Sequence, residues 1–273
     1  AGAIVSIQDY NKTFDNNNFT VTPASGEKIN GGSADGVLII STEGQGLTFV
    51  YVDSTVGWKT VHENEFIAGG SNFISATGGT ITCSGNCRIH TFTGPGTFTV
   101  NAIAACAANN TVSHLVVAGG GGGATYGTNN NASGGGGGGG FREVKTPVTP
   151  YTASPLDGYP TPGNRVTVAV QSYPIVVGGG GAGAPGAGGG ACGTQGSSSS
   201  FSGISSAGGG AGSKAVGASG GSGGGAGGGA TGRAGGAGNT PPVTPAQGFA
   251  GGGSPGPGPD HAAGGGGGAT EAG

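Results

Sequence analysis

Short apolar or alternating runs fill the first part of the chain. The clearest lie at 19–22, 37–40 and 47–52, and each is bounded by clusters of Gly, Asn, Asp or Ser. Such runs between turn clusters are typical of short β-strands. No stretch combines a helical period with capping residues. We therefore predict that residues 1–82 form a small all-β module resembling a β-sandwich or β-barrel, with Trp58 in its core or in a contact between subunits.

The strand pattern continues through residues 83–118 and ends in glycine. Further strand-like runs lie at 87–92, 97–100 and 112–118, and the last passes directly into the glycines at 119–123. We predict that 83–118 is a β-strand connector that leads into a different kind of domain.

Glycine dominates residues 119–273. The whole chain has 71 Gly among 273 residues, about a quarter, against roughly 7% in ordinary proteins. Two passages with Pro-rich stretches, 141–177 and 239–263, interrupt the glycine pattern. A segment of this composition is either a flexible linker or a fold that forms without a hydrophobic core.

Packed polyglycine II helices are the ordered alternative. Such an extended helix has roughly three residues per turn and no internal hydrogen bonds, so its N–H and C=O groups can pair with neighbouring helices. Strand-like entries at 115–118 and 173–177 lead into glycine runs, and a linker of this length inside a compact protein is unusual. We predict an all-β fold in which 119–273 is a glycine-rich domain of packed polyglycine II helices.

Charge and hydropathy narrow the possible partners. Charged residues make up 8% of the chain and the net charge is −3. Nucleic-acid binding requires a basic face that releases counterions, so we predict no nucleic-acid partner. We also predict no membrane insertion, because the chain has no run of about 18 or more apolar residues.

The four cysteines predict neither a disulfide-rich scaffold nor a metal centre. They are Cys83, Cys87, Cys106 and Cys192. Cys83 and Cys87 could close a tight hairpin loop, or all four could be free thiols. No second Cys/His pair follows at the spacing of a zinc site, so we expect no metal and no cofactor.

No catalytic constellation emerges from the sequence. The glycines at 178, 180 and 183 follow a strand-like run and match a dinucleotide fingerprint, but the residues behind them cannot form the helix that holds the pyrophosphate. The four histidines are scattered, and no nucleophile–base pair or carboxylate pair can be named. We predict that the protein is not an enzyme.

Segments between the glycine runs are the candidate binding residues. Loops rich in Tyr, Asn and Ser serve many binding surfaces as rigid anchors and adaptable hydrogen-bonding groups. The alternative is that they are only solvated turns. The candidate contact residues are Tyr126, Asn129, Asn130, Asn131, Phe201 and Phe249.

Several strings resemble the glycine-rich domain of bacteriophage tail-fibre and virion structural proteins. They include RIHTFTGPGTFTV at 88–100, HLVVA at 114–118, GFRE at 140–143 and YPIVVG at 173–178. The first module is similar to the small β domains that precede such tips. The resemblance implies a homotrimeric fibre of a virion, extracellular in location, which contacts other tail or fibre proteins. It also implies a receptor on the host surface, either a glycan or an outer-membrane protein.

Two other functions remain open at this point. One is a passive structural role in the fibre or as a decoration of the capsid. The other is an extracellular ice-binding or matrix protein, because bundles of glycine helices can present a flat, regular face. That function predicts a strict period of three with Thr or Ala on one face, whereas the glycine spacing here is irregular.

Overall fold

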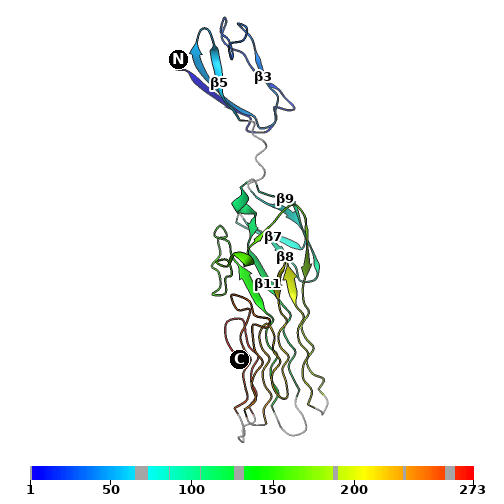
Figure 1. Cartoon of the computed structure of the whole chain (residues 1–273). Coiled ribbons are helices and arrows are strands. Elements are labelled where there is room, and N and C mark those ends of the chain that lie inside the picture. The colour runs from blue at the N-terminus through cyan, green and yellow to red at the C-terminus, as the bar shows by residue number, and fades with distance from the viewer. Residues whose placement is uncertain are drawn as a thin grey trace. The chain divides into compact units, whose positions relative to one another are not determined.

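The computed structural model describes residues 2–64, 73–85, 87–104, 106–125, 132–186, 190–229, 232–255 and 262–273. The chain divides into two compact units, Ala1–Asn72 and Phe73–Gly273 (Figure 1). Regular structure in the described part is almost entirely β, with two short 3-10 turns, η1 (Ala107–Asn110) and η2 (Pro162–Asn164). None of its helices has the length and hydrophobicity of a membrane span. The predicted all-β fold is confirmed.

The first unit contains two antiparallel sheets. Strands β1 (Ile4–Gln8), β4 (Gly46–Asp53) and β5 (Gly57–Asn64) form a three-stranded sheet in the order β1-β4-β5. Strands β2 (Phe19–Val21) and β3 (Leu38–Ile40) form a two-stranded sheet. The apolar runs at 19–22, 37–40 and 47–52 therefore do form strands.

The core of the first unit is small and lies between these sheets. Ile40, Leu47 and Phe49 are buried, and Trp58 packs against them at its edge. The Trp58 indole Nε1 donates a hydrogen bond to Glu27 Oε2 at 2.7 Å, which satisfies the polar group of this aromatic residue. Trp58 thus packs against the core, one of the two places predicted for it.

The second unit begins with a β cap. Its five-stranded sheet has the order β16-β15-β14-β9-β6. These strands are β6 (Ser75–Thr77), β9 (Gly96–Ala102), β14 (Ser172–Val176), β15 (Ser199–Phe201) and β16 (Ile204–Ser206). Three two-stranded antiparallel sheets complete the cap: β7 (Thr80–Ser84) with β8 (Cys87–Thr91), β10 (Thr111–Val112) with β13 (Val166–Thr167), and β11 (His114–Val117) with β12 (Phe141–Val144).

The division between the units lies before the predicted boundary at residue 82. Strand β6 pairs with β9, across Ser75–Ala102 and Thr77–Thr99. This pairing holds residues from 73 onward in the second unit. The predicted connector, 83–118, is thus part of the β cap and contributes its strands β8 to β11.

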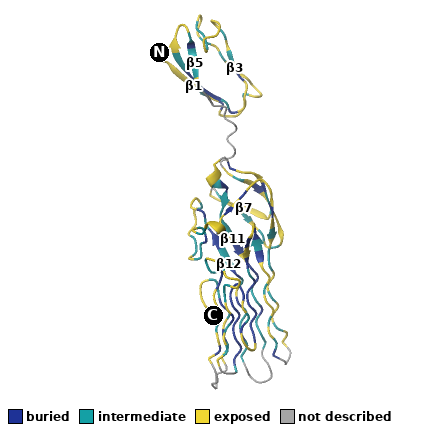
Figure 2. Cartoon of the chain, viewed as in Figure 1, coloured by how far each residue is buried: buried dark blue, intermediate teal, exposed yellow. Residues whose placement is uncertain are grey.

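Aromatic side chains from distant parts of the sequence form the core of the β cap. Phe98, Tyr173 and Phe201 meet with ring centroids 6.0 to 6.3 Å apart. All three are buried, together with Val100 and Val116. Figure 2 shows this buried region continuing from the cap into the glycine-rich segments. The cap therefore has a conventional hydrophobic core from which the glycine-rich segments extend.

Extended glycine-rich segments run side by side away from the β cap (Figure 1). We call them glycine helices, and they cover residues 118–125, 132–140, 177–186, 190–198, 207–213, 223–229, 232–238, 249–255 and 262–268. Backbone hydrogen bonds link these segments to one another throughout their length. The glycine-rich half is a folded lattice and not a linker.

Helix 118–125 shows the threefold pattern of this lattice. Every third N–H group, beginning at Ala118, donates to helix 132–140, and the next set, beginning at Gly119, donates to helix 190–198, over 2.8 to 3.0 Å. Its carbonyls accept from two further neighbours, helices 177–186 and 207–213. A repeat of about three residues is that of polyglycine II, which confirms the predicted glycine-helix domain.

The lattice requires glycine at some positions and tolerates side chains at others. A Cβ atom at Gly122 would lie 2.0 Å from the carbonyl oxygen of Ala182, whereas a Cβ at Gly123 would meet nothing nearer than 3.9 Å. Thus Gly122 faces a tightly packed neighbouring helix, whereas the adjacent Gly123 faces open space. Close approach of backbones, and not turn formation, explains why glycine is needed at positions such as Gly122.

Candidate binding site at the distal end of the glycine helices

The glycine helices end together on the side away from the β cap, which we call the distal end (Figure 1). Backbone hydrogen bonds join the last described residues of several helices there. The Thr125 N–H donates to the Ala191 carbonyl at 3.0 Å, and the Gly228 N–H donates to the Ala132 carbonyl at 2.8 Å. These hydrogen bonds hold the distal ends of neighbouring glycine helices next to one another.

Arg233 binds carbonyl groups at the distal end that accept no backbone N–H among the described residues. Its Nη1 donates to the carbonyls of Gly228 at 3.0 Å and Gly227 at 3.3 Å, and also to that of Lys214. Carbonyls at the end of an extended helix have no neighbouring N–H group, and the five N–H donors of a guanidinium suit this task. Arg233 closes the lattice as a capping residue closes an α-helix.

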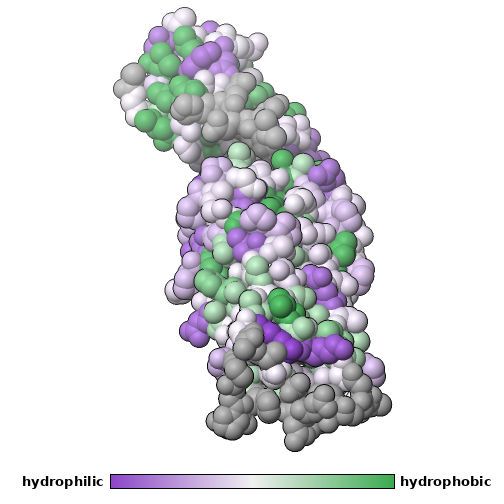
Figure 3. All heavy atoms as spheres, turned by 60° about the horizontal axis from the view of Figure 1, so that its bottom comes forward, coloured by the Kyte–Doolittle hydropathy of each residue, from purple (hydrophilic) through white to green (hydrophobic). Residues whose placement is uncertain are grey.

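Positive charge gathers at the same place. The Lys214 side chain is exposed beside Arg233, and strongly hydrophilic residues border the distal segments in Figure 3. These two are the only Lys or Arg residues after residue 177 of the sequence. Sequence reasoning did not select them, although two isolated cations in a nearly uncharged segment could have drawn attention.

An exposed thiol lies near these cations. Cys192 Sγ is 3.4 Å from Ser213 Oγ, and the Ser213 hydroxyl also accepts from the Ala215 N–H at 2.9 Å. The Ser213 hydrogen bond, followed by that from the Lys214 backbone, lowers the pKa of the Cys192 thiol. All four cysteines are free. In the β7–β8 hairpin, Ser84 and not Cys83 stands opposite Cys87, so of the two predicted states the free thiol is the one observed.

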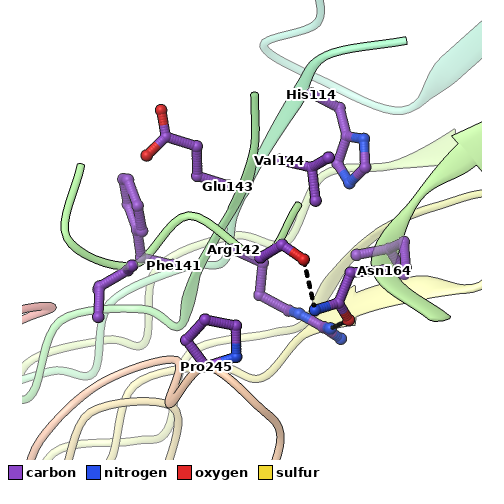
Figure 4. A pocket seen from close by; sticks show the side chains of 10 residues that line it. His114, Phe141, Arg142, Glu143, Val144, Asn164 and Pro245 are labelled. Atoms are coloured by element: carbon purple, nitrogen blue, oxygen red, sulfur yellow. Dashed lines mark hydrogen bonds between the residues drawn. The ribbon is translucent and has the colours of Figure 1, made fainter. Parts of the chain in front are cut away.

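A second candidate site is a cavity at the junction between the β cap and the glycine helices (Figure 4). Its volume is about 10 Å³, which is close to the smallest space that holds one water molecule. Ligand pockets for small molecules are far larger. The polar residues His114, Arg142, Glu143 and Asn164 line it together with apolar residues. The cavity is a packing feature of the junction, and the distal end remains the candidate binding site.

Comparison of the sequence with known protein families identifies a glycine-rich domain, in agreement with the observed glycine helices. The model of the glycine-rich domain family matches residues 90–273. The chain belongs to the glycine-rich domain family. No curated protein and no solved structure matches it. The matched region begins within β8 and contains the rest of the β cap as well as every glycine helix. In this family member the cap and the lattice belong to one compact unit.

The predicted contact residues of this glycine-rich domain protein fall into three groups. Tyr126, Asn129, Asn130 and Asn131 lie outside the described residues. Their neighbours on either side, Thr125 and Ala132, are both at the distal end, where they pair with Ala191 and Gly228. The attachment points of this predicted binding segment are thus fixed by the lattice.

Phe201 and Phe249 lie elsewhere. Phe201 is 9% exposed in the aromatic core of the β cap, and this burial does not fit the predicted contact with a receptor. The cause is the pairing of Phe201 with Ile175 across β14 and β15, which turns its ring into the core. Phe249 is 39% exposed but lies near the β cap, because the neighbouring Gln247 carbonyl accepts from the Phe141 N–H at 2.8 Å.

No metal centre is evident in the part of the chain that the structure describes. Within it, no group of three or more His, Cys, Asp or Glu side chains is arranged to bind a metal ion. The distal end instead offers backbone amides, hydroxyl groups and two cations. These groups can bind a ligand through hydrogen bonds and charge.

Proposed function

We propose that this protein is a fibre or tip protein of a tailed bacteriophage that binds a host surface through the distal end of its glycine helices. The observation that carries the proposal is that several helices end together and are joined there by backbone hydrogen bonds. A rigid scaffold that holds short loops together is the usual arrangement of a binding surface. The receptor is a glycan or an outer-membrane protein of the host.

The chemistry at the distal end suits such a receptor. Lys214 and Arg233 supply positive charge, which attracts the anionic groups of bacterial cell surfaces and speeds encounter. Tyr126 and the asparagines that follow it add a stacking ring and amide groups for sugar hydroxyls. Because the lattice is rigid, little conformational entropy is lost when a ligand binds.

Assembly into a homotrimer on the virion is the second part of the proposal. The first unit has a small core and many exposed apolar side chains, among them Ile4 at 66% and Ile39 at 57% exposure. Small domains with little core gain from association. Sedimentation equilibrium of the purified chain tests this directly: a mass of three chains is expected, and a monomer at micromolar concentration would contradict it.

An adsorption experiment tests the binding function. Fluorescently labelled protein is added to bacterial strains that support the parent phage, and phage adsorption is measured with and without excess unlabelled protein. We expect labelling of sensitive strains and competition with the phage. A passive structural component would give neither.

A matched pair of variants locates the surface. Tyr126→Ala removes a ring from the predicted binding segment, and Tyr10→Ala removes a 92% exposed ring from the first unit. We expect the first change to reduce cell labelling by at least about tenfold, as for a binding hot spot, and the second to leave it unchanged. Equal labelling by both variants would place the receptor contact away from residues 126–131.

A further inference from the structure

His114 lies where the β cap joins the first glycine helix. It is the first residue of β11, and β11 continues through Val117 into helix 118–125. In the pairing with β12, His114 stands opposite Val144, and Val116 stands opposite Arg142. His114 and Arg142 therefore share one face of this pair, the face that packs toward the core of the cap.

His114 is partly buried, and its two ring nitrogens are fully buried. Both ring nitrogens are inaccessible to solvent, and neither has a hydrogen-bond partner among the described residues. The ring packs edge-to-face against Phe201, with centroids 5.7 Å apart. Buried polar atoms without a partner are rare in folded proteins and require an explanation. Here the ring is held as an apolar, uncharged group.

The charge that acts on His114 is the positive charge of Arg142. Arg142 lines the same cavity as His114 (Figure 4), and its guanidinium is fixed there because Nη2 donates to Asn164 Oδ1 at 2.5 Å. Asn164 in turn donates to the Thr244 carbonyl at 2.8 Å. Arg142 thus cannot move away from a protonated His114 without loss of the contacts that hold the 239–248 loop to the cap.

No carboxylate on the neighbouring elements compensates this charge. Glu143 also lines the cavity, but it follows Arg142 on the other face of β12, where its Oε2 accepts the Ser154 N–H at 2.9 Å and its carboxylate bonds to Tyr151. Asp157 is occupied by the N–H groups of Lys145 and Tyr159. The two strands that pack on β11, β15 and β16, consist of Ser, Phe and Ile residues and carry no titratable group.

We propose that His114 makes the junction between the β cap and the glycine helices sensitive to acid. Protonation would place an imidazolium, opposed only in part by the nearby Val112 carbonyl, beside a fixed guanidinium and against the Phe201 ring. Acid therefore favours a state in which β11 has separated from β15 and the His114 ring reaches water. Because β11 leads directly into helix 118–125, this separation loosens the helix that contacts four others in the lattice.

The direction of the effect follows from the pKa. Burial, and to a smaller extent the Arg142 charge, lowers the pKa of His114 below its ordinary value, and the nearby Val112 carbonyl only partly opposes this. A histidine whose pKa is lowered by folding binds its proton more readily when unfolded. The closed junction thus has its full stability above about pH 6.5 and loses stability as the pH falls from there toward the folded-state pKa of His114.

NMR titration of the imidazole signals of the full chain tests the proposal directly. His90 is the internal control, because it lies in the same cap and its Nδ1 bonds to the Gly78 carbonyl at 2.8 Å. We expect His114 to titrate below the ordinary range of histidine. Titration of His114 at or above about pH 6.5 would overturn the proposal, and this measurement needs no variant.

Thermal unfolding gives the second readout. For the wild-type chain we expect the melting temperature of the second unit to fall between pH 7.5 and 5, by about 3 to 5 °C for each unit by which the pKa of His114 is lowered. His114→Leu should reduce this pH dependence more than the matched variant His90→Leu does. An equal pH dependence in wild type and His114→Leu would contradict the proposal.

Discussion

Gln247 Oε1 accepts a hydrogen bond from the backbone N–H of Ala207 at 2.7 Å, with the Gln247 side chain only 1% exposed. Ala207 is the first residue after β16, where the chain leaves the β cap and enters a glycine helix. The Gln247 Nε2 donates to the Pro241 carbonyl at 2.8 Å. The Gln247 side chain thus supplies a hydrogen-bond acceptor to the first N–H group of a glycine helix and holds the Pro-rich loop against this helix.

Replacement of Gln247 should destabilise the second unit. Gln247→Leu keeps a similar volume but leaves the Ala207 N–H and the Pro241 carbonyl without partners, at a cost of about 1 to 3 kcal/mol for each buried group. Chemical denaturation followed by circular dichroism measures the change. The control is Gln195→Leu, an exposed glutamine whose Nε2 bonds to the Ser219 carbonyl, and a change within about 0.5 kcal/mol is expected there. Equal losses in the two variants would mean that Gln247 does not cap the helix.

Adjacent glycines of helix 118–125 should respond differently to alanine. Gly122→Ala would force a methyl group to within 2.0 Å of the Ala182 carbonyl oxygen, so helices must separate at a cost of at least about 1 to 3 kcal/mol. Gly123→Ala meets only a contact at 3.9 Å and should be neutral or stabilising by up to about 1 kcal/mol, since alanine restricts the unfolded chain. Denaturation midpoints of both variants provide the measurement, and an equal loss at the two positions would argue against the observed packing.

Acid should weaken the first unit through Asp9. Burial raises the pKa of Asp9, but hydrogen bonds from the backbone N–H groups of Phe14, Thr13 and Gly44 outweigh it, and the net pKa is lowered. A carboxylate with a lowered pKa stabilises the fold above its unfolded-state pKa of about 4, and this contribution is lost as the pH falls through the folded-state value.

Trp58 is the one tryptophan of the chain, so its fluorescence reports on the first unit alone. Asp9→Asn should lower the stability of that unit at pH 7 and remove most of its dependence on pH below about 4. Asp15→Asn is the control, because Asp15 bonds only to the exposed Asn16 side chain among the described contacts. An unchanged acid transition in Asp9→Asn would refute the assigned role.

The distal end should depend on the shape of Arg233 as well as on its charge. Arg233→Lys retains the cation but loses the fork of donors that reaches the Gly227 and Gly228 carbonyls. We expect faster hydrogen exchange of the amides in 223–229 and 249–255, by about tenfold for a loss near 1.4 kcal/mol. Lys214→Gln, which removes charge without these bonds, should leave exchange unchanged. Slower or equal exchange in Arg233→Lys would show that the carbonyls are satisfied in another way.

The sequence by itself determined the kinds of structure in this protein. Apolar runs bounded by turn residues located strands such as β2, β3 and β4, because a strand's period is a local property of the chain. The abundance of glycine beside the strand-like entries was enough to predict the packed glycine helices. The sequence also shows that the lattice carries little charge and that Lys214 and Arg233 are its two cationic residues after residue 177.

The tertiary structure alone decided which residues meet. Phe201 looked like a loop residue in its glycine- and serine-rich surroundings, yet pairing with Ile175 turns it into the core. Gln247 and Ala207 lie 40 positions apart in sequence, and no local signal links them. In the lattice, the glycine helices are joined by backbone hydrogen bonds that any residue can make. These bonds therefore do not determine which helices lie side by side. The few side chains at helix ends and at the junction therefore fix the arrangement, and their partners become visible only in the folded chain.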